Sequence, residues 1–391
     1  MPANPPLTAL TGLRFFAALA IFNIHTTYFI QGPDMPDWRF LHQVASGEIA
    51  GVSLFFVLSG FILAYSHNDA SISRHSLVTF WIGRLSRIYP VYFLALIWYA
   101  PFILTHRFAV EPTATAFGKS LASFVPSVFL VQSWIHPRSA IAWNGPGWTL
   151  SVEAVFYLLF PFMASRIRLL PRRALPFFAL GLWCLSLTLT LSASRILTGW
   201  NYATLFVSVN PLFHLPTFGV GIALGYHFLG SNMPIKRTSW LAVLGLGTIL
   251  LLTLFIDSFP DVVIHNCLFV PAFCLLIYGL AQGARTSAIF SLPALVLLGE
   301  ASYGFYILQF PQGMTFRWLN EGMSFADRVG PAPSGGILHG WIAYTVLLLL
   351  TSASSIAIFK CFEVPMRLSI RRYAANFSLK PRAMAGVSEI R

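Results

Sequence analysis

The sequence LTALTGLRFFAALAIFNIH, residues 7–25, decides the fold class of this chain. It is an apolar run long enough for a helix that crosses most of a bilayer, yet it contains Arg14 and His25. These residues are eleven positions apart, which makes about three helical turns and places both side chains on one face, about 16 Å apart along the axis. An ionisable residue inside a membrane span is costly and indicates a functional site. A snorkelling arginine and a buried, hydrogen-bonded histidine are the structural alternative.

The composition extends this interpretation to the whole chain. Of the 391 residues, 56% are hydrophobic and only 10% are charged, whereas a soluble domain carries about 25% charged residues. The apolar segments are long runs rather than the alternating strands of a membrane barrel. We therefore expect an all-α, polytopic transmembrane bundle whose surroundings are a lipid bilayer.

Hydropathy predicts about ten membrane spans and one further apolar segment. The spans cover residues 7–30, 48–66, 88–105, 148–165, 174–195, 211–229, 240–257, 264–283, 289–311 and 338–360. The run from Lys119 to Ile135 is broken by Pro126 and is expected to form a re-entrant or interfacial helix. We expect one transmembrane domain over residues 1–372 and a short, basic, disordered cytoplasmic tail over residues 373–391.

The net charge of +12 is explained by where the cations lie, so no nucleic-acid partner is expected. With the N-terminus in the cytoplasm, the cytoplasmic loops and the tail hold seventeen Lys and Arg residues, and the outer loops hold seven. Cytoplasmic loops collect such residues. The asymmetry predicts that both termini are cytoplasmic, with Arg14 toward the cytoplasm and His25 toward the outer side.

Several kinds of site have no support in the sequence. The four cysteines lie in or at the ends of apolar runs, without the spacing of a metal site or a disulfide framework. No metal is therefore expected. The chain also lacks a GxSxG elbow, a P-loop, a GxGxxG loop and an HExxH motif.

Two arginines and a glutamate mark further candidate positions. The segment FWIGRLSRIYPVY, residues 80–92, places Arg84 and Arg87 on one helical face. Two guanidiniums there suit a phosphorylated ligand, and pairing with lipid phosphates is the alternative. Glu153, in WTLSVEAVFYLLFP over residues 148–161, is the clearest carboxylate inside a predicted span and needs a partner there. A structural ion pair is the alternative for Glu153.

Two more segments carry polar or small residues inside spans. LGEASYGFYILQFP, residues 298–311, contains Glu300, Ser302 and Gln309, which line one cavity or form a structural hydrogen-bond network. GVSLFFVLSGFIL, residues 51–63, is rich in small residues that allow close helix packing. Room for an acyl chain is the alternative role of that segment.

Taken together, these blocks resemble the acyltransferase 3 family of integral membrane O-acyltransferases over roughly residues 7–372. The resemblance rests on LTALTGLRFFAALAIFNIH with its Arg-x10-His spacing, GVSLFFVLSGFIL, RLSRIYP over residues 84–90 and WTLSVEAVFYLLFP. The later segments SYGFYILQFP and FEVPMR agree as well. Many family members carry a histidine where Gln309 stands, and some carry a fused esterase-like domain that this sequence lacks.

The resemblance implies transfer of an acyl group, usually acetyl, from cytoplasmic acyl-CoA to a hydroxyl that is often part of a carbohydrate. By resemblance, His25 is the catalytic histidine, and Arg14, Arg84 and Arg87 act on the acyl-CoA side. Acyl-CoA is then a donor substrate, and no permanently bound cofactor is expected. The resemblance also favours a bacterial inner membrane.

The expected mechanism gives each remaining residue a role. His25 acts as general base on the acceptor or takes the acyl group transiently, and Glu153 orients it. Trp148, Ser302 and Gln309 are the expected substrate-binding groups, with Ser302 or Trp148 stabilising the oxyanion. The alternative function is a transporter or flippase for a glycolipid or small molecule, with Arg14, His25 and Glu153 as proton or substrate sites. The sequence indicates neither the acceptor nor an oligomeric state.

Overall fold

The computed structural model describes residues 4–26, 50–67, 73–231, 235–283, 285–321, 337–338 and 340–378. Within these ranges the regular elements are helices, and no strand occurs. Seven helical segments are long and apolar enough to cross a membrane. The protein is therefore an integral membrane protein with an all-α helical bundle, as the composition predicts.

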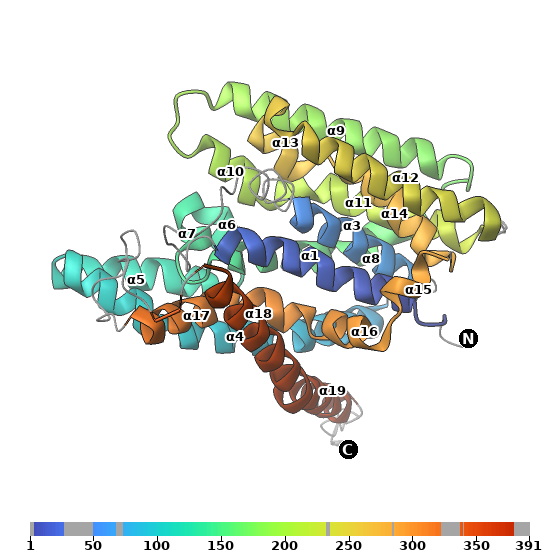
Figure 1. Ribbon diagram of the computed structural model, residues 1–391. Coiled ribbons are helices and arrows are strands. Elements are labelled where there is room, and N and C mark those ends of the chain that lie inside the picture. Colours follow the sequence, from blue (N-terminus) through green and yellow to red (C-terminus); the bar gives the residue numbers. More distant parts are fainter. Residues whose placement is uncertain are drawn as a thin grey trace, which may run out of the picture.

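Most of the predicted spans correspond to single helices that lie side by side (Figure 1). They are α1 (Thr8–Thr26), α3 (Ala50–Ser66), α4 (Arg74–Val110), α8 (Trp148–Ile167), α9 (Leu175–Ile196), α11 (Pro211–Leu229), α12 (Ile235–Leu254) and α18 (Gly340–Ile358). Shorter elements connect them: α5 (Thr113–Val128), α6 (Gln132–Ile135), α7 (Pro137–Ile141), η1 (Gly145–Gly147), α10 (Ala203–Val209), η2 (Ile256–Ser258), α13 (Asp261–Asn266) and α15 (Ser287–Phe290). The predicted span 264–283 is divided, because α13 ends at Asn266 and α14 covers Val270–Ala281. The last four residues of the first predicted span, 27–30, lie outside the described residues.

The predicted span 289–311 differs from expectation because it is divided between two helices. α16 (Pro293–Glu300) ends inside the predicted span, and α17 (Ser302–Glu321) begins after Ala301. The Ser302 hydroxyl donates to the Gly299 carbonyl at 2.7 Å, a local bond that competes with regular helix continuation. Hydropathy does not detect such a break, since both halves are apolar.

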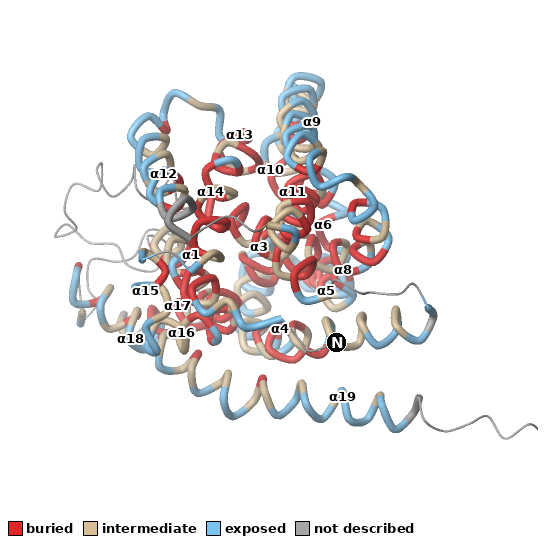
Figure 2. The backbone as a smooth tube through the Cα atoms, turned by 90° about the vertical axis from the view of Figure 1, so that its right-hand side faces the viewer, coloured by how far each residue is buried: buried red, intermediate tan, exposed pale blue. Residues whose placement is uncertain are grey.

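The centre of the bundle is the pair α3 and α11, which approach so closely that side chains do not fit between them. A Cβ added at Gly60 would lie 2.3 Å from the Phe218 carbonyl oxygen, and one at Gly221 would lie 2.1 Å from the Val57 carbonyl oxygen. Figure 2 shows α3 and α11 in the buried centre, with α9, α12 and α19 (Val364–Ser378) largely exposed. The small residues of the α3 segment therefore have the packing role expected of them.

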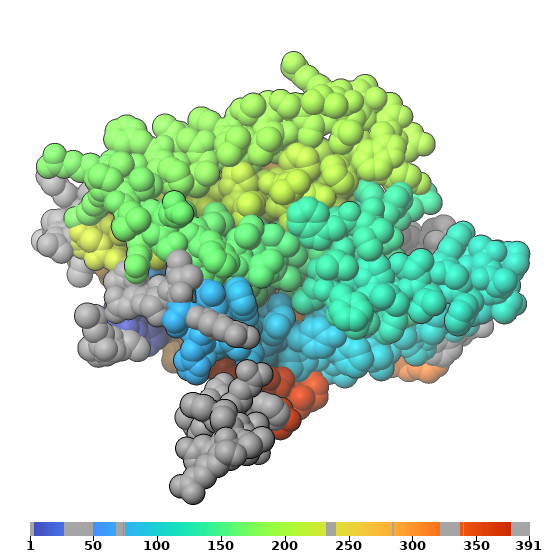
Figure 3. Space-filling view, turned by 180° about the vertical axis from the view of Figure 1, so that it is seen from behind, coloured from blue at the N-terminus to red at the C-terminus, as the bar shows by residue number. Residues whose placement is uncertain are grey.

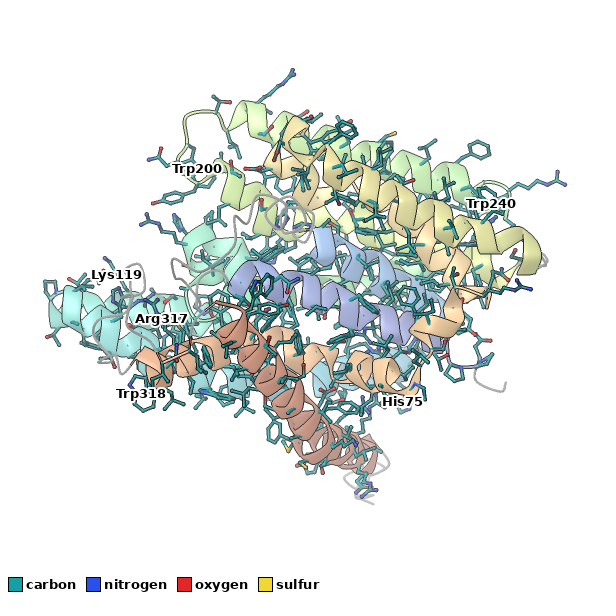
Figure 4. All side chains as sticks on the ribbon, viewed as in Figure 1. His75, Lys119, Trp200, Trp240, Arg317 and Trp318 are labelled. Atoms are coloured by element: carbon teal, nitrogen blue, oxygen red, sulfur yellow. The ribbon has the colours of Figure 1, made fainter. Side chains whose placement is uncertain are left out.

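Polar and aromatic side chains mark the two ends of the bundle. α1 begins at one end (Figure 1), where Figure 4 also places His75 and Trp240. Lys119, Trp200 and Arg317 lie at the opposite end (Figure 4). The segment expected to be re-entrant or interfacial contains α5, which also lies at that opposite end, beside α4.

The C-terminal part of the chain begins with a short π-helix, η3 (Phe359–Glu363), which joins α18 to α19. α19 continues through residues 373–378 of the segment expected to be a disordered tail. Residues 379–391 lie outside the described part of the chain. The division into a domain over 1–372 and a tail over 373–391 stays a prediction.

The contact between α1 and α16 supplies a test of the packing. A Cβ added at Gly299 would lie 1.9 Å from the Thr11 carbonyl oxygen, whereas one at Gly247 in α12 would meet nothing within 4 Å. We expect Gly299→Ala to force the helices apart and to cost about 1–3 kcal/mol of stability. In thermal unfolding of the detergent-solubilised protein, Gly299→Ala should lower Tm by several degrees, while Gly247→Ala should leave it unchanged. Equal Tm values for the two variants would contradict the close contact.

Candidate active site

Three helices bring the predicted arginines and Glu153 to one place inside the bundle. Arg14 comes from α1, Arg84 and Arg87 come from α4, and Glu153 comes from α8. Arg14, Arg87 and Glu153 line a cavity of about 510 Å³, its open mouth included. The residues that the sequence singled out on separate segments therefore meet around one space.

A second cavity of about 360 Å³ adjoins the first, because Arg14, Phe55, Arg87 and Tyr157 line both. Arg84 lines this second cavity. Its remaining wall comes from Leu58, Ser59, Ile62 and Leu63 of α3, further along that helix toward the end of the bundle at which α1 begins. The two cavities thus lead from that end into the bundle, past the three arginines.

The arginine charges lie among partners that do not neutralise them by direct contact. Glu153 accepts a hydrogen bond from the Tyr157 hydroxyl at 2.9 Å and lies within electrostatic range of Arg14, Arg84 and Arg87. Among the described residues, none of the three guanidiniums is close enough to a carboxylate to form an ion pair. Lys119 and Glu111, elsewhere in the described chain, do form an ion pair, at 2.7 Å. The guanidiniums are therefore available to an anionic ligand.

Arg84 contacts an aromatic ring, and one of its nitrogen atoms has no hydrogen-bond partner among the described residues. Its guanidinium lies over the Phe80 ring at 5.6 Å, and its buried Nε has no hydrogen-bond partner among the described residues. Its field also reaches His67, in the turn after α3. Burial together with the nearby Arg84 charge lowers the pKa of His67 to about 4, so this histidine is neutral at physiological pH and does not screen the arginines.

A second carboxylate in this group was not among the predicted site residues. Glu363, at the end of the π-helix, is 2% exposed and lies within electrostatic range of Arg87, Arg367 and Arg14. The segment FEVPMR contributed to the family resemblance, but it follows the last predicted span, 338–360, and no site residue was predicted in it. Only the packing of α19 against α4 brings it to the arginines.

Tyrosines form the remaining polar wall and were also missed. Tyr157, Tyr303 and Tyr306 line the larger cavity. The Tyr303 hydroxyl donates to the Ile88 carbonyl, and the Tyr306 hydroxyl donates to the Pro146 carbonyl at 3.2 Å. In LGEASYGFYILQFP the prediction named Glu300, Ser302 and Gln309, although Tyr303 and Tyr306 lie in the same segment and could have been inferred from it.

His25 lies near the opposite end of α1, outside the walls of the two cavities. Its ring meets the Phe310 ring edge to face at 4.8 Å, and Gln309 is its polar neighbour. The buried atoms His25 Nδ1 and Gln309 Oε1 have no hydrogen-bond partner in the part of the chain that the structure describes. Two unpartnered polar atoms at this depth mark a place where a polar ligand is accommodated.

One turn of α17 connects the cavity to this histidine. Tyr306 lines the cavity, and its backbone carbonyl accepts a hydrogen bond at 2.7 Å from Nε2 of Gln309, the neighbour of His25. Tyr306 and Gln309, one turn apart on α17, therefore lie between the cavity and His25. The separation of Arg14 from His25 follows the spacing on α1, about 16 Å along the axis.

The other predicted residues divide between this site and its surroundings. Ser302 lines the larger cavity, whereas Glu300 is exposed at the end of α16. Trp148 packs against Phe56, and its ring lies 5.5 Å from His214 and 5.4 Å from His265. Phe56, not Trp148, is the cavity wall on that side. Glu153 lies with Tyr157 and the arginines rather than beside His25, where it was expected to act.

The comparison with models of protein families shows which family the chain belongs to. A family model described as an acyltransferase domain matches residues 7–360. The chain belongs to the acyltransferase 3 family. This assignment makes the protein an enzyme that transfers acyl groups other than aminoacyl groups, and it decides against the transporter alternative.

Curated relatives of this acyltransferase come from bacteria. An acyltransferase named MdmB from Streptomyces mycarofaciens is 31% identical over 366 residues, which cover 87% of this chain and 88% of the relative. The O-acetyltransferase OatA of Staphylococcus aureus is 26% identical over 333 residues, covering 78% of this chain. A putative peptidoglycan O-acetyltransferase, YrhL of Bacillus subtilis, is 27% identical over 186 residues, or 42% of this chain.

The relatives differ in how much of their length is shared with this acyltransferase. The chain spans 50% of OatA and 26% of YrhL. No solved structure matches the chain.

The absence of an ion pair at Arg84, among the described residues, predicts that removing its charge stabilises the ligand-free protein. A buried cation without an ion pair is costly, so Arg84→Met in this acyltransferase should raise Tm of the ligand-free protein by a few degrees, corresponding to about 1 kcal/mol. The control is Arg166→Met, because Arg166 is exposed at the end of α8 and its replacement should leave Tm unchanged. A ligand-free Tm below that of the wild type for Arg84→Met would contradict this account.

Proposed function

We propose that this enzyme transfers an acyl group, in particular acetyl, from cytoplasmic acyl-CoA to a hydroxyl of a carbohydrate-type acceptor. The observation that carries the proposal is the meeting of Arg14, Arg84 and Arg87, without ion-paired carboxylates among the described residues, at two adjoining cavities inside the bundle. His25 lies outside both cavities, on the same helix as Arg14. Guanidiniums bind phosphates with charge-assisted hydrogen bonds. A CoA thioester supplies both the phosphates for this end and a long, narrow arm for the interior.

The donor enters with its phosphates at the arginines and its thioester directed into the bundle. The larger cavity offers an apolar wall from Val52, Phe55, Phe56, Ile88 and Leu150. Such a wall excludes water from the thioester and strengthens the electrostatic contacts inside. Ser302 and Tyr306 are the polar groups on that wall that we assign to the substrate, and Gln309 extends them toward His25.

His25 acts on the acceptor. Its unpartnered Nδ1 takes the proton of the acceptor hydroxyl while the hydroxyl oxygen attacks the thioester carbonyl carbon. The carbon–sulfur bond breaks, and the departing CoA thiolate receives the proton from the imidazolium. The acyl ester and free CoA are the products, so the step balances without a metal or a redox cofactor.

The acceptor class and the membrane placement rest on the relatives and on the charge pattern. OatA and YrhL are named as O-acetyltransferases, and the name of YrhL specifies peptidoglycan. We assign a carbohydrate or glycosylated acceptor to this chain on that basis. We also place it in a bacterial cytoplasmic membrane with both termini cytoplasmic, because the predicted loops on that side carry seventeen Lys and Arg residues against seven on the other.

The role of His25 is tested by substitution at matched expression. Wild-type membranes should transfer radiolabelled acetyl from acetyl-CoA to membrane glycans or lipids, and His25→Ala should reduce the transfer at least 100-fold because the base is lost. His75→Ala is the control, since His75 is exposed at the end of the bundle at which α1 begins (Figure 4). Retained transfer by folded His25→Ala protein would overturn the assignment.

Donor binding is tested separately from transfer. CoA should raise Tm of the purified wild-type protein by binding the folded state, and the increase should be lost in Arg87→Gln. An equal increase in both proteins would show that CoA binds elsewhere. Arg166→Gln, at an exposed position on α8, should keep the full increase.

A further inference from the structure

α19 brings two more arginines to the mouth of the site, and neither has a role in the proposed reaction. Arg371 donates from Nη2 to the Gly83 carbonyl at 3.3 Å, directly before Arg84 on α4. Arg367 lies one turn earlier on the same face of α19 and within electrostatic range of Glu363. Figure 3 shows the α19 residues (red) against the α4 region (light blue).

These side chains extend the first arginine group outward along α4. Arg371 lies within electrostatic range of Arg367, Arg87 and Arg84. Its contact at Gly83 is one turn nearer the start of α4 than Arg87, on the side away from the larger cavity. A cation at this position is too far from the interior to act on the thioester, but it faces the part of a ligand that stays at the mouth.

Glu363 explains how so many cations approach one another. It is almost fully buried, lies within electrostatic range of both Arg87 and Arg367, and its Oε2 has no hydrogen-bond partner among the described residues. A buried carboxylate between two guanidiniums lowers their mutual repulsion. It is a positioning residue that holds α19 against the arginines of α1 and α4.

We infer that Arg367 and Arg371 form a second phosphate subsite, which recognises the donor phosphate that is remote from the thioester. This inference rests on the proposed CoA donor, whose 3′-phosphate is separate from its pyrophosphate. Arg14, Arg84 and Arg87 hold the pyrophosphate near the cavity, and the α19 arginines hold the 3′-phosphate at the mouth. A phospholipid headgroup presents the same phosphate chemistry, so the test must separate the two sources.

The test compares acetyl-CoA with acetyl-dephospho-CoA, which lacks only the 3′-phosphate. The wild-type protein in nanodiscs should prefer acetyl-CoA by about tenfold or more in kcat/KM, the contribution of a charged hydrogen bond, mainly through KM. Arg371→Ala should lose most of this preference by raising KM for acetyl-CoA alone. Arg372→Ala is the matched control, because Arg372 is exposed on α19 about 100° around the helix from Arg371, and it should keep the preference.

The contrary outcomes are distinct. Equal use of both donors by the wild-type protein would overturn the subsite and leave the CoA donor intact. If Arg371→Ala and Arg372→Ala weaken activity alike, and only in nanodiscs that contain phosphatidylglycerol, the arginines bind lipid headgroups and the inference is wrong. Absence of transfer from acetyl-CoA, acetyl-dephospho-CoA and acetyl-pantetheine would overturn the proposed function itself.

Discussion

The burial of several guanidiniums in an apolar bundle is the constraint on which the rest of the site depends. A cation in this position needs either a direct carboxylate partner or a polar environment. Here the polar environment comes from Glu153, Glu363 and the cavity tyrosines. Neither carboxylate is close enough to Arg14, Arg84 or Arg87 to form an ion pair. Arg14, Arg84 and Arg87 therefore keep their charges without a direct carboxylate contact among the described residues, as the proposed phosphorylated donor requires.

The packing of the bundle makes this costly arrangement possible. Helices that carry no cation, such as α3 and α11, pack through glycine with almost no space between their backbones. α1 is held in the same way against α15 at Gly12, where an added Cβ would meet the Phe290 carbonyl, and against α16 at Gly299. Gly12 lies close to Arg14 on α1. Tight contacts on one side of α1 thus fix the backbone from which Arg14 extends into the cavity on the other side. Dispersion and close packing, the main attractive forces between helices in lipid, offset the cost of the charges.

Sequence reasoning predicted what depends on local pattern and missed what depends on tertiary contacts. Most spans follow from the length of the apolar runs. Helical period and a shared depth in the membrane predict the grouping of Arg14 with Arg84 and Arg87. The break after Glu300 did not follow, because a serine hydroxyl bonded to a backbone carbonyl leaves hydropathy unchanged. Glu363 was missed because its distance from Arg87 depends on how α19 folds back. The expected partnership of Glu153 with His25 was a guess about depth, and the carboxylate lies with the arginines instead.

One helix, α17, contributes to both the cavity and the surroundings of His25. This helix lines the cavity through Ser302 and Tyr306 and carries Gln309 and Phe310 to His25. Its position is fixed from the far side by η1, where Nδ2 of Asn144 donates to the Ile307 carbonyl at 2.9 Å. At Gly145 an added Cβ would lie 2.5 Å from the Phe310 ring, so glycine there allows Phe310 to support the imidazole. Because Arg14 and His25 both lie on α1, the spacing along that helix sets their separation. A shift of α17 alone would move Ser302, Tyr306 and Gln309 relative to both residues without changing the distance between Arg14 and His25.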